Sequence, residues 1–71
     1  MKGFAIIDAR GIDIKTVSGT RRAAIVNWLV VEKGIFIYTQ ATDGLIEDLW
    51  TTHKGSADVA EVLVTVIGRV N

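Results

Sequence analysis

A chain of 71 residues is enough for one small domain, which we expect to span residues 1–71. It has no cysteine and a single histidine, His53, which excludes disulfides, thiolate metal sites and sites built from several histidines. Eight basic side chains balance eight acidic ones, so the net charge does not favour strong non-specific binding to nucleic acid or anionic membranes.

Nearly half of the residues (49%) are apolar, which is typical of a globular protein. One core in a chain this short contributes only about 3–5 kcal/mol, and natural proteins of this size often add a disulfide, a metal or a partner subunit. The partner subunit is the option that remains here. The chain shows neither a signal peptide nor an apolar run near the roughly 20 residues of a membrane helix. We therefore expect a cytoplasmic protein without a cofactor.

The first elements predicted in the chain are two strands of an antiparallel hairpin. Residues 3–9 (GFAIIDA) form a short apolar run, and Arg10-Gly11 is the expected turn. Residues 12–17 (IDIKTV) alternate with the period of a half-buried strand. One side carries Ile12, Ile14 and Thr16, and the other carries Asp13, Lys15 and Val17.

The next segment, Ser18 to Gly34, is predicted to be a helix. Ser18 is one candidate for the N-cap and Thr20 is the other, while Gly34 suits the left-handed end of a helix. Several β-branched residues inside the segment would also fit a strand. The length of the segment favours a helix, because most strands stop at about five or six residues.

This predicted helix has an unusually wide apolar surface. An apolar sector of a little over about 100° is usual for a surface helix, and this one exceeds it. Its broad apolar arc consists of Ala23, Ala24, Val26, Trp28, Val30 and Val31, interrupted by Asn27. We expect the sheet to cover one side of the helix, and a second helix or a second subunit to cover another.

The chain then runs through a short β-prone segment into a second helix. Residues 35–38 (IFIY) are assigned as a weak strand. From Thr42 onward, apolar residues recur at helical spacing, with Thr42 or Asp43 as the cap and Gly55 as the stop. The residues of this stripe are Leu45, Ile46, Leu49, Trp50 and His53.

Residues 58–67 (DVAEVLVTVI) are predicted to form a final strand, with Ala60, Val62, Val64 and Val66 on one face. A valine-rich strand at the edge of a sheet invites pairing with another chain, so this strand is either central or a dimer edge. The resulting order β-β-α-(β)-α-β predicts an α+β two-layer sandwich with a mainly antiparallel sheet of 3–4 strands and two helices.

The stretches TVSGTRRAAIVNWLV and TDGLIEDLW resemble small proteins from bacterial and phage-derived genomes whose function is unassigned. This resemblance would cover most of the chain. It implies a bacterial or prophage origin and assigns no role to any residue.

The paired arginines Arg21 and Arg22 are one candidate for a functional site. Positive charge opposes the dipole at the start of a helix, so the two guanidinium groups could bind an anion or nucleic acid together with free N–H groups. The alternative is pairing with carboxylates such as Glu32 or Asp13. A nucleic-acid-binding regulator that uses Arg21 and Arg22 is the second functional hypothesis.

Three further residue groups have a structural interpretation beside a functional one. His53 with Asp48 and Glu47 could bind a metal, but the spacing does not bring them together on a helix, so a helix-terminal histidine is favoured. Trp28 and Trp50 could stack on a ligand, but their apolar stripes favour a core or an interface. Asn27 would either bond across a helix–helix contact or face solvent.

No phosphate loop, catalytic triad or carboxylate pair with a suitable base is present in the sequence. We therefore expect a non-enzymatic accessory or regulatory interaction module that works as a homodimer. The residues expected at its interface are Val26, Asn27, Trp28, Val30 and Trp50. A factor of toxin–antitoxin or phage type that masks a host protein is a third hypothesis.

Overall fold

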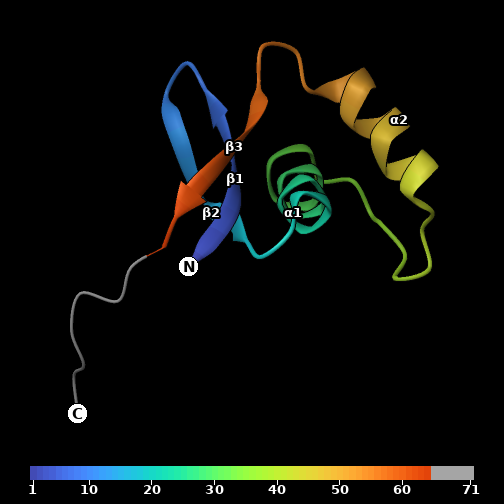
Figure 1. The fold of residues 1–71 in the computed structure, drawn as a ribbon. Coiled ribbons are helices and arrows are strands. Elements are labelled where there is room, and N and C mark those ends of the chain that lie inside the picture. Colours follow the sequence, from blue (N-terminus) through green and yellow to red (C-terminus); the bar gives the residue numbers. More distant parts are fainter. Residues whose placement is uncertain (65–71) are drawn as a thin grey trace.

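The computed structural model describes residues 1–64, which form one sheet and two helices in the order β-β-α-α-β. The sheet has the strand order β2-β1-β3, and both strand pairs are antiparallel. Both helices lie on the same side of the sheet (Figure 1), so the prediction of a two-layer α+β sandwich is confirmed. The elements are β1 (Lys2–Asp8), β2 (Gly11–Ser18), α1 (Arg21–Lys33), α2 (Asp43–His53) and β3 (Asp58–Leu63).

The final strand lies at an edge of the sheet, and the first strand lies at the centre. β3 pairs with β1 from Lys2 opposite Leu63 to Ile7 opposite Asp58. Of the two positions that the sequence allowed for the last strand, the structure therefore has the edge. β3 ends at Leu63, whereas the predicted strand ran from 58 to 67, and positions 65–67 of that prediction lie outside the described residues.

The pairing of β2 with β1 is interrupted by a large bulge. Ile6 pairs with Asp13 and Phe4 pairs with Ser18, so residues 14–17 lie opposite Ala5 alone. The hydroxyl group of Thr16 fills the gap in the ladder. It accepts the Ile6 N–H at 2.8 Å and donates to the Asp13 carbonyl at 2.6 Å. Thr16 is fully buried, so this side chain replaces a missing backbone partner.

Both helices begin and end at residues that suit helix termini. Thr20 is the N-cap of α1 and accepts the Ala23 N–H at 3.1 Å, whereas Ser18, the other candidate, belongs to β2. Gly34 ends α1 with φ 65°, a left-handed conformation that glycine adopts without strain. Thr42 is the N-cap of α2 and accepts the Leu45 N–H.

The core lies between the sheet and the two helices. The rings of Trp28 and Trp50 meet edge to face, with centroids 5.2 Å apart, so the second helix covers the side of α1 that the sheet does not. The sequence predicted that a second helix or a second subunit would cover α1, and α2 of the same chain provides this cover. The buried core cluster consists of Ile6, Ala24, Ile25, Trp28, Leu29, Ile46, Trp50 and Ala57.

The prediction of a strand at residues 35–38 is wrong. This segment connects α1 to α2 on the side of the molecule away from the sheet, where no strand is available for pairing (Figure 1). The Ile35 N–H donates to the Leu29 carbonyl at the end of α1 instead. Ile35 and Ile37 pack against the core while Phe36 and Tyr38 are exposed. The side chains therefore alternate between core and solvent as in a strand, but the backbone forms no strand pairing.

Replacing Thr16 tests the bulge. Thr16→Val keeps the shape of the side chain but leaves the buried Ile6 N–H without a partner, so we expect a loss of about 1–3 kcal/mol in the free energy of unfolding. Thr16→Ser keeps the hydroxyl group and removes one methyl group, which should cost about 0.8 kcal/mol. Urea unfolding followed by tryptophan fluorescence measures both. Equal losses for the two variants would contradict this role of the hydroxyl group.

Candidate interaction surface

The sheet has one face against the helices and one face that no other helix or strand of residues 1–64 covers. Side chains alternate between the two faces of a strand, and paired residues share a face. Phe4, Ile6 and Val59 contact the core and so define the inner face. The neighbouring positions define what we call the outer sheet face. Its residues are Gly3, Ala5 and Ile7 of β1, Ile12 and Val17 of β2, Ala60 and Val62 of β3, and Val64.

The middle of the outer sheet face is made of small residues that larger neighbours overlie. Ala5 is completely buried although it lies outside the core cluster. A Cβ atom added at Gly3 would lie 3.4 Å from a methyl group of Val64 and 3.6 Å from one of Val62. It would also lie 3.1 Å from the Ser18 carbonyl oxygen, so the sheet is tightest at this point. The edge strands thus provide the apolar layer above β1.

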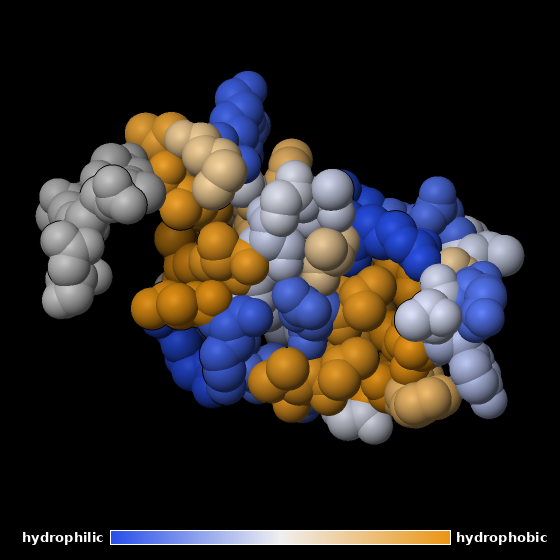
Figure 2. All heavy atoms as spheres, turned by 90° about the horizontal axis from the view of Figure 1, so that it is seen from below, coloured by the Kyte–Doolittle hydropathy of each residue, from blue (hydrophilic) through white to orange (hydrophobic). Residues whose placement is uncertain are grey.

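The outer sheet face exposes apolar side chains to solvent. Ile7 is 37% exposed, Val17 38% and Ile12 51%, and Ile14 in the bulge is 81% exposed. Figure 2 shows apolar residues at the left, on the sheet side of the molecule, and a second apolar group at the lower right. Asp58, the first residue of β3, is the one charged residue at an outward register position in the described strands. Of the predicted apolar side of residues 12–17, Ile12 and Ile14 are therefore exposed, whereas Thr16 is buried in the bulge.

A second set of apolar side chains is exposed on the helix side. Phe36 and Tyr38 in the connection between the helices are 78% and 67% exposed, and their rings meet edge to face at 5.0 Å. Val31 of α1 is 51% exposed. Close to Val31 in sequence, the Lys33 ammonium lies over the buried Trp28 ring, 5.2 Å from its centre. The helix side is therefore less uniform than the outer sheet face.

The five residues that the sequence suggested for an interface are divided between the core and the surface. Trp28 and Trp50 are only 5% and 3% exposed, because they close the contact between the two helices inside the chain. Val26 is half-buried against the core, and Val30 is 44% exposed. Asn27 donates from Nδ2 to the Ser18 hydroxyl at 2.8 Å, so it joins α1 to β2 and makes neither of the contacts expected for it.

The two arginines at the start of α1 are held by acidic residues of α2. Arg21 forms an ion pair with Glu47, and this pairing raises the pKa of the Arg21 guanidinium. Arg22 donates to Asp43 at 2.6 Å and to the Ala41 carbonyl at 2.8 Å. The expected partners Glu32 and Asp13 are not used by either arginine. The positive charge that opposes the α1 dipole is offset by carboxylates at the start of α2.

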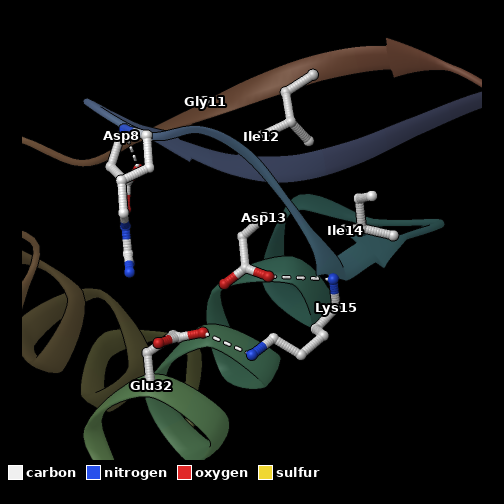
Figure 3. Close-up of a pocket in the computed structure, with 8 residues that line it drawn as sticks. Asp8, Gly11, Ile12, Asp13, Ile14, Lys15 and Glu32 are labelled. Atoms are coloured by element: carbon white, nitrogen blue, oxygen red, sulfur yellow. Dashed lines mark hydrogen bonds and ion pairs between the residues drawn. The ribbon is translucent and has the colours of Figure 1, made fainter.

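Charged residues also line a shallow pocket of about 310 Å³ between the β1–β2 turn, β2 and the end of α1. Figure 3 shows Asp13 and Lys15 directed toward Glu32, with Ile12 and Ile14 pointing away from it. The Lys15 ammonium lies 3.2 Å from the Glu32 carboxylate. A hydrogen bond with Asp13 and the charge of Lys15 together lower the pKa of Glu32 below its ordinary value of 4.5.

The turn at the rim of this pocket carries a second charged pair. The Arg10 N–H donates to Asp8 Oδ1 at 2.8 Å, and its guanidinium group lies 3.3 Å from Oδ2. The backbone hydrogen bond is the main reason that the pKa of Asp8 lies below its ordinary value of 3.8. The charges around the pocket therefore satisfy one another, and the lining contains no histidine, serine or cysteine to act as base or nucleophile.

His53 is the last residue of α2, as the helix-terminal interpretation expects. It lines a second shallow pocket together with Trp28 and Lys54. Within residues 1–64, no group of three or more histidine or acidic side chains is placed to hold a metal ion. Neither helix in this part of the chain is long and apolar enough to cross a membrane.

Sequence reasoning missed the outer sheet face. The signal was present in Ile12 and Ile14, which alternate with charged residues as a half-buried strand does. Such alternation shows that one side of a strand is apolar, and it does not show whether helices will cover that side. Comparisons with known protein families, curated proteins and solved structures find no match to this chain.

The Glu32–Lys15 contact predicts a dependence of stability on pH. Because the folded pKa of Glu32 is lowered, its charge stabilises the fold above pH 4.5, and this contribution is lost as the pH falls through the folded pKa. Glu32→Gln should lower the urea midpoint slightly at pH 7 and make the loss of stability in acid less steep. Asp48→Asn is the control, since Asp48 forms no ion pair among residues 1–64. Identical pH profiles for Glu32→Gln and the wild type would contradict the prediction.

Proposed function

We propose that this protein is a small non-enzymatic interaction module that works as a homodimer in an accessory or regulatory role. The observation that supports the proposal is the amount of apolar surface in residues 1–64. Eleven large apolar side chains there are more than a third exposed, although the chain has only 71 residues. Contiguous apolar surface that no other residue of the described range 1–64 covers is characteristic of a protein–protein interface.

A non-enzymatic role is supported by the state of the polar groups. The charged side chains around the pocket at Glu32 are paired with one another, and this pocket is shallow. Enzyme sites place a base, a nucleophile or a metal in a concave pocket where a reacting group can reach them. We further propose a cytoplasmic location and a bacterial or prophage origin, in line with the resemblance of the arginine-containing segment to small proteins of such genomes.

The geometry gives less support to a nucleic-acid-binding regulator. Binding to phosphates would require Arg21 and Arg22 to exchange their carboxylate partners on α2 for the ligand. The N-terminus of α1 is also next to Glu47 and Asp43, whose negative charge repels a polyanion.

The proposal is tested by the oligomeric state of the wild-type protein in solution. Multi-angle light scattering across the micromolar range should give a mass that rises from 7.7 kDa toward twice that value as concentration increases. A mass that stays at 7.7 kDa over this range would contradict the homodimer. A salt-sensitive mobility shift of DNA or RNA that Arg21→Ala/Arg22→Ala removes would favour the nucleic-acid function instead.

A further inference from the structure

We infer that the outer sheet face is the surface on which a second copy of this chain packs, so that two sheets meet face to face with the helices outside. This inference rests on the proposed homodimer and names the surface that forms it. It differs from the expectation that α1 or the edge of β3 makes the contact. The inference follows from the chemistry of the face, the state of the sheet edges and the size of the contact.

The chemistry of the outer sheet face suits an apolar partner. Its exposed apolar positions are Ile7, Ile12 and Val17, and half-buried Val62 lies beside them, while exposed Asp58 stands at the margin of the face. Among residues 1–64, no second layer covers this side of the sheet (Figure 1). Antiparallel sheets with one apolar face are stable when that face packs on another layer, and sheets pack on sheets about 10 Å apart.

The edges of the sheet are less suited to pairing with another strand. On β2, the bulge removes the regular ladder, and the Lys15 N–H already donates to Asp13 Oδ1 at 3.1 Å. On β3, the Val59 N–H donates to Asp58 Oδ1 at 2.8 Å and is not available to a neighbouring chain. A β-bulge protects an edge strand from strand addition, and the occupied Val59 N–H removes one donor from the edge of β3. The open face is then the apolar part of the sheet that remains without a partner.

The size of the face fits a second copy. Three strands about 4.8 Å apart and about 3.3 Å long per residue present roughly 300 Å² in projection. An uneven layer of side chains has more accessible surface than its projection. Two such faces together therefore approach the total of about 1,000 Å² at which specific interfaces begin. A contact near this lower limit belongs to the class of small, weak or transient interfaces.

The charge of the molecule also favours a second copy of the chain as the partner of the outer sheet face. A face without charged groups at its centre does not select a charged partner, and it is complementary to another flat apolar surface of equal extent. A second copy provides this surface by two-fold symmetry. The formal net charge of the chain is zero, so two copies approach each other without net repulsion.

The test compares two isolated lysine substitutions at equally exposed apolar positions. Ile12 on the outer sheet face and Val31 on α1 are both 51% exposed. Ile12→Lys would bury an unpaired ammonium group in the contact, so we expect the dimer dissociation constant to rise at least about 30-fold, as for a hot-spot residue. Val31→Lys should change it less than about threefold. Light scattering measures the constants, and circular dichroism checks that both variants fold.

The outcomes separate this inference from the proposed function. A wild-type protein that stays monomeric overturns both. A wild-type dimer that Ile12→Lys leaves intact overturns the outer sheet face alone and leaves the homodimer standing. Loss of the dimer in Val31→Lys but not in Ile12→Lys places the contact on the helices and also overturns the inference.

A second measurement decides the matter if Ile12→Lys does not fold. The chain has no cysteine, so Ile12→Cys and Val31→Cys each provide a single thiol. The rate of alkylation by iodoacetamide at Ile12→Cys should fall as protein concentration rises, because dimerisation covers the site. The rate at Val31→Cys should stay constant. A constant rate at Ile12→Cys, under conditions where light scattering detects the dimer, would overturn the inference.

Discussion

The contact between Trp28 and Trp50 is the interaction on which the arrangement of this molecule depends. α1 is apolar over most of its circumference, and the sheet covers only one side of it. The edge-to-face packing of the two rings holds α2 against another side and closes the core. It also places the acidic start of α2 beside Arg21 and Arg22, so the ion pairs between the helices follow from an apolar contact.

Because α2 packs on α1, both helices lie on the same side of the sheet. A chain of 71 residues with three strands and two helices has nothing left to form another layer within residues 1–64. Within this described range, no further element is present to cover the outer sheet face. In a larger α+β protein, a further helix or a second sheet would lie over Ile7, Ile12 and Val17.

Most of the elements could be predicted from the sequence, because local signals determine them. Thr20, Gly34 and Thr42 mark the ends of the helices through hydrogen bonds to nearby backbone groups. Long-range features could not be predicted. The partners of Arg21 and Arg22 lie more than twenty residues away on another helix, and residues 35–38 have strand propensity but no strand beside them. The bulge also reverses a simple expectation, since it buries Thr16 and leaves Ile14 exposed.

The bulge in β2 has a consequence for how far assembly can proceed. A small protein with an apolar sheet face and two regular edges could grow in two directions at once, and repeated edge pairing leads to fibres. In this chain, one edge is distorted opposite Ala5, and on the other an aspartate occupies an outward N–H. Both features reduce the regular backbone groups available for strand addition, and a face-to-face contact of the kind proposed would close after two copies by two-fold symmetry. Thr16, by bridging the bulge, therefore keeps the edge of β2 irregular.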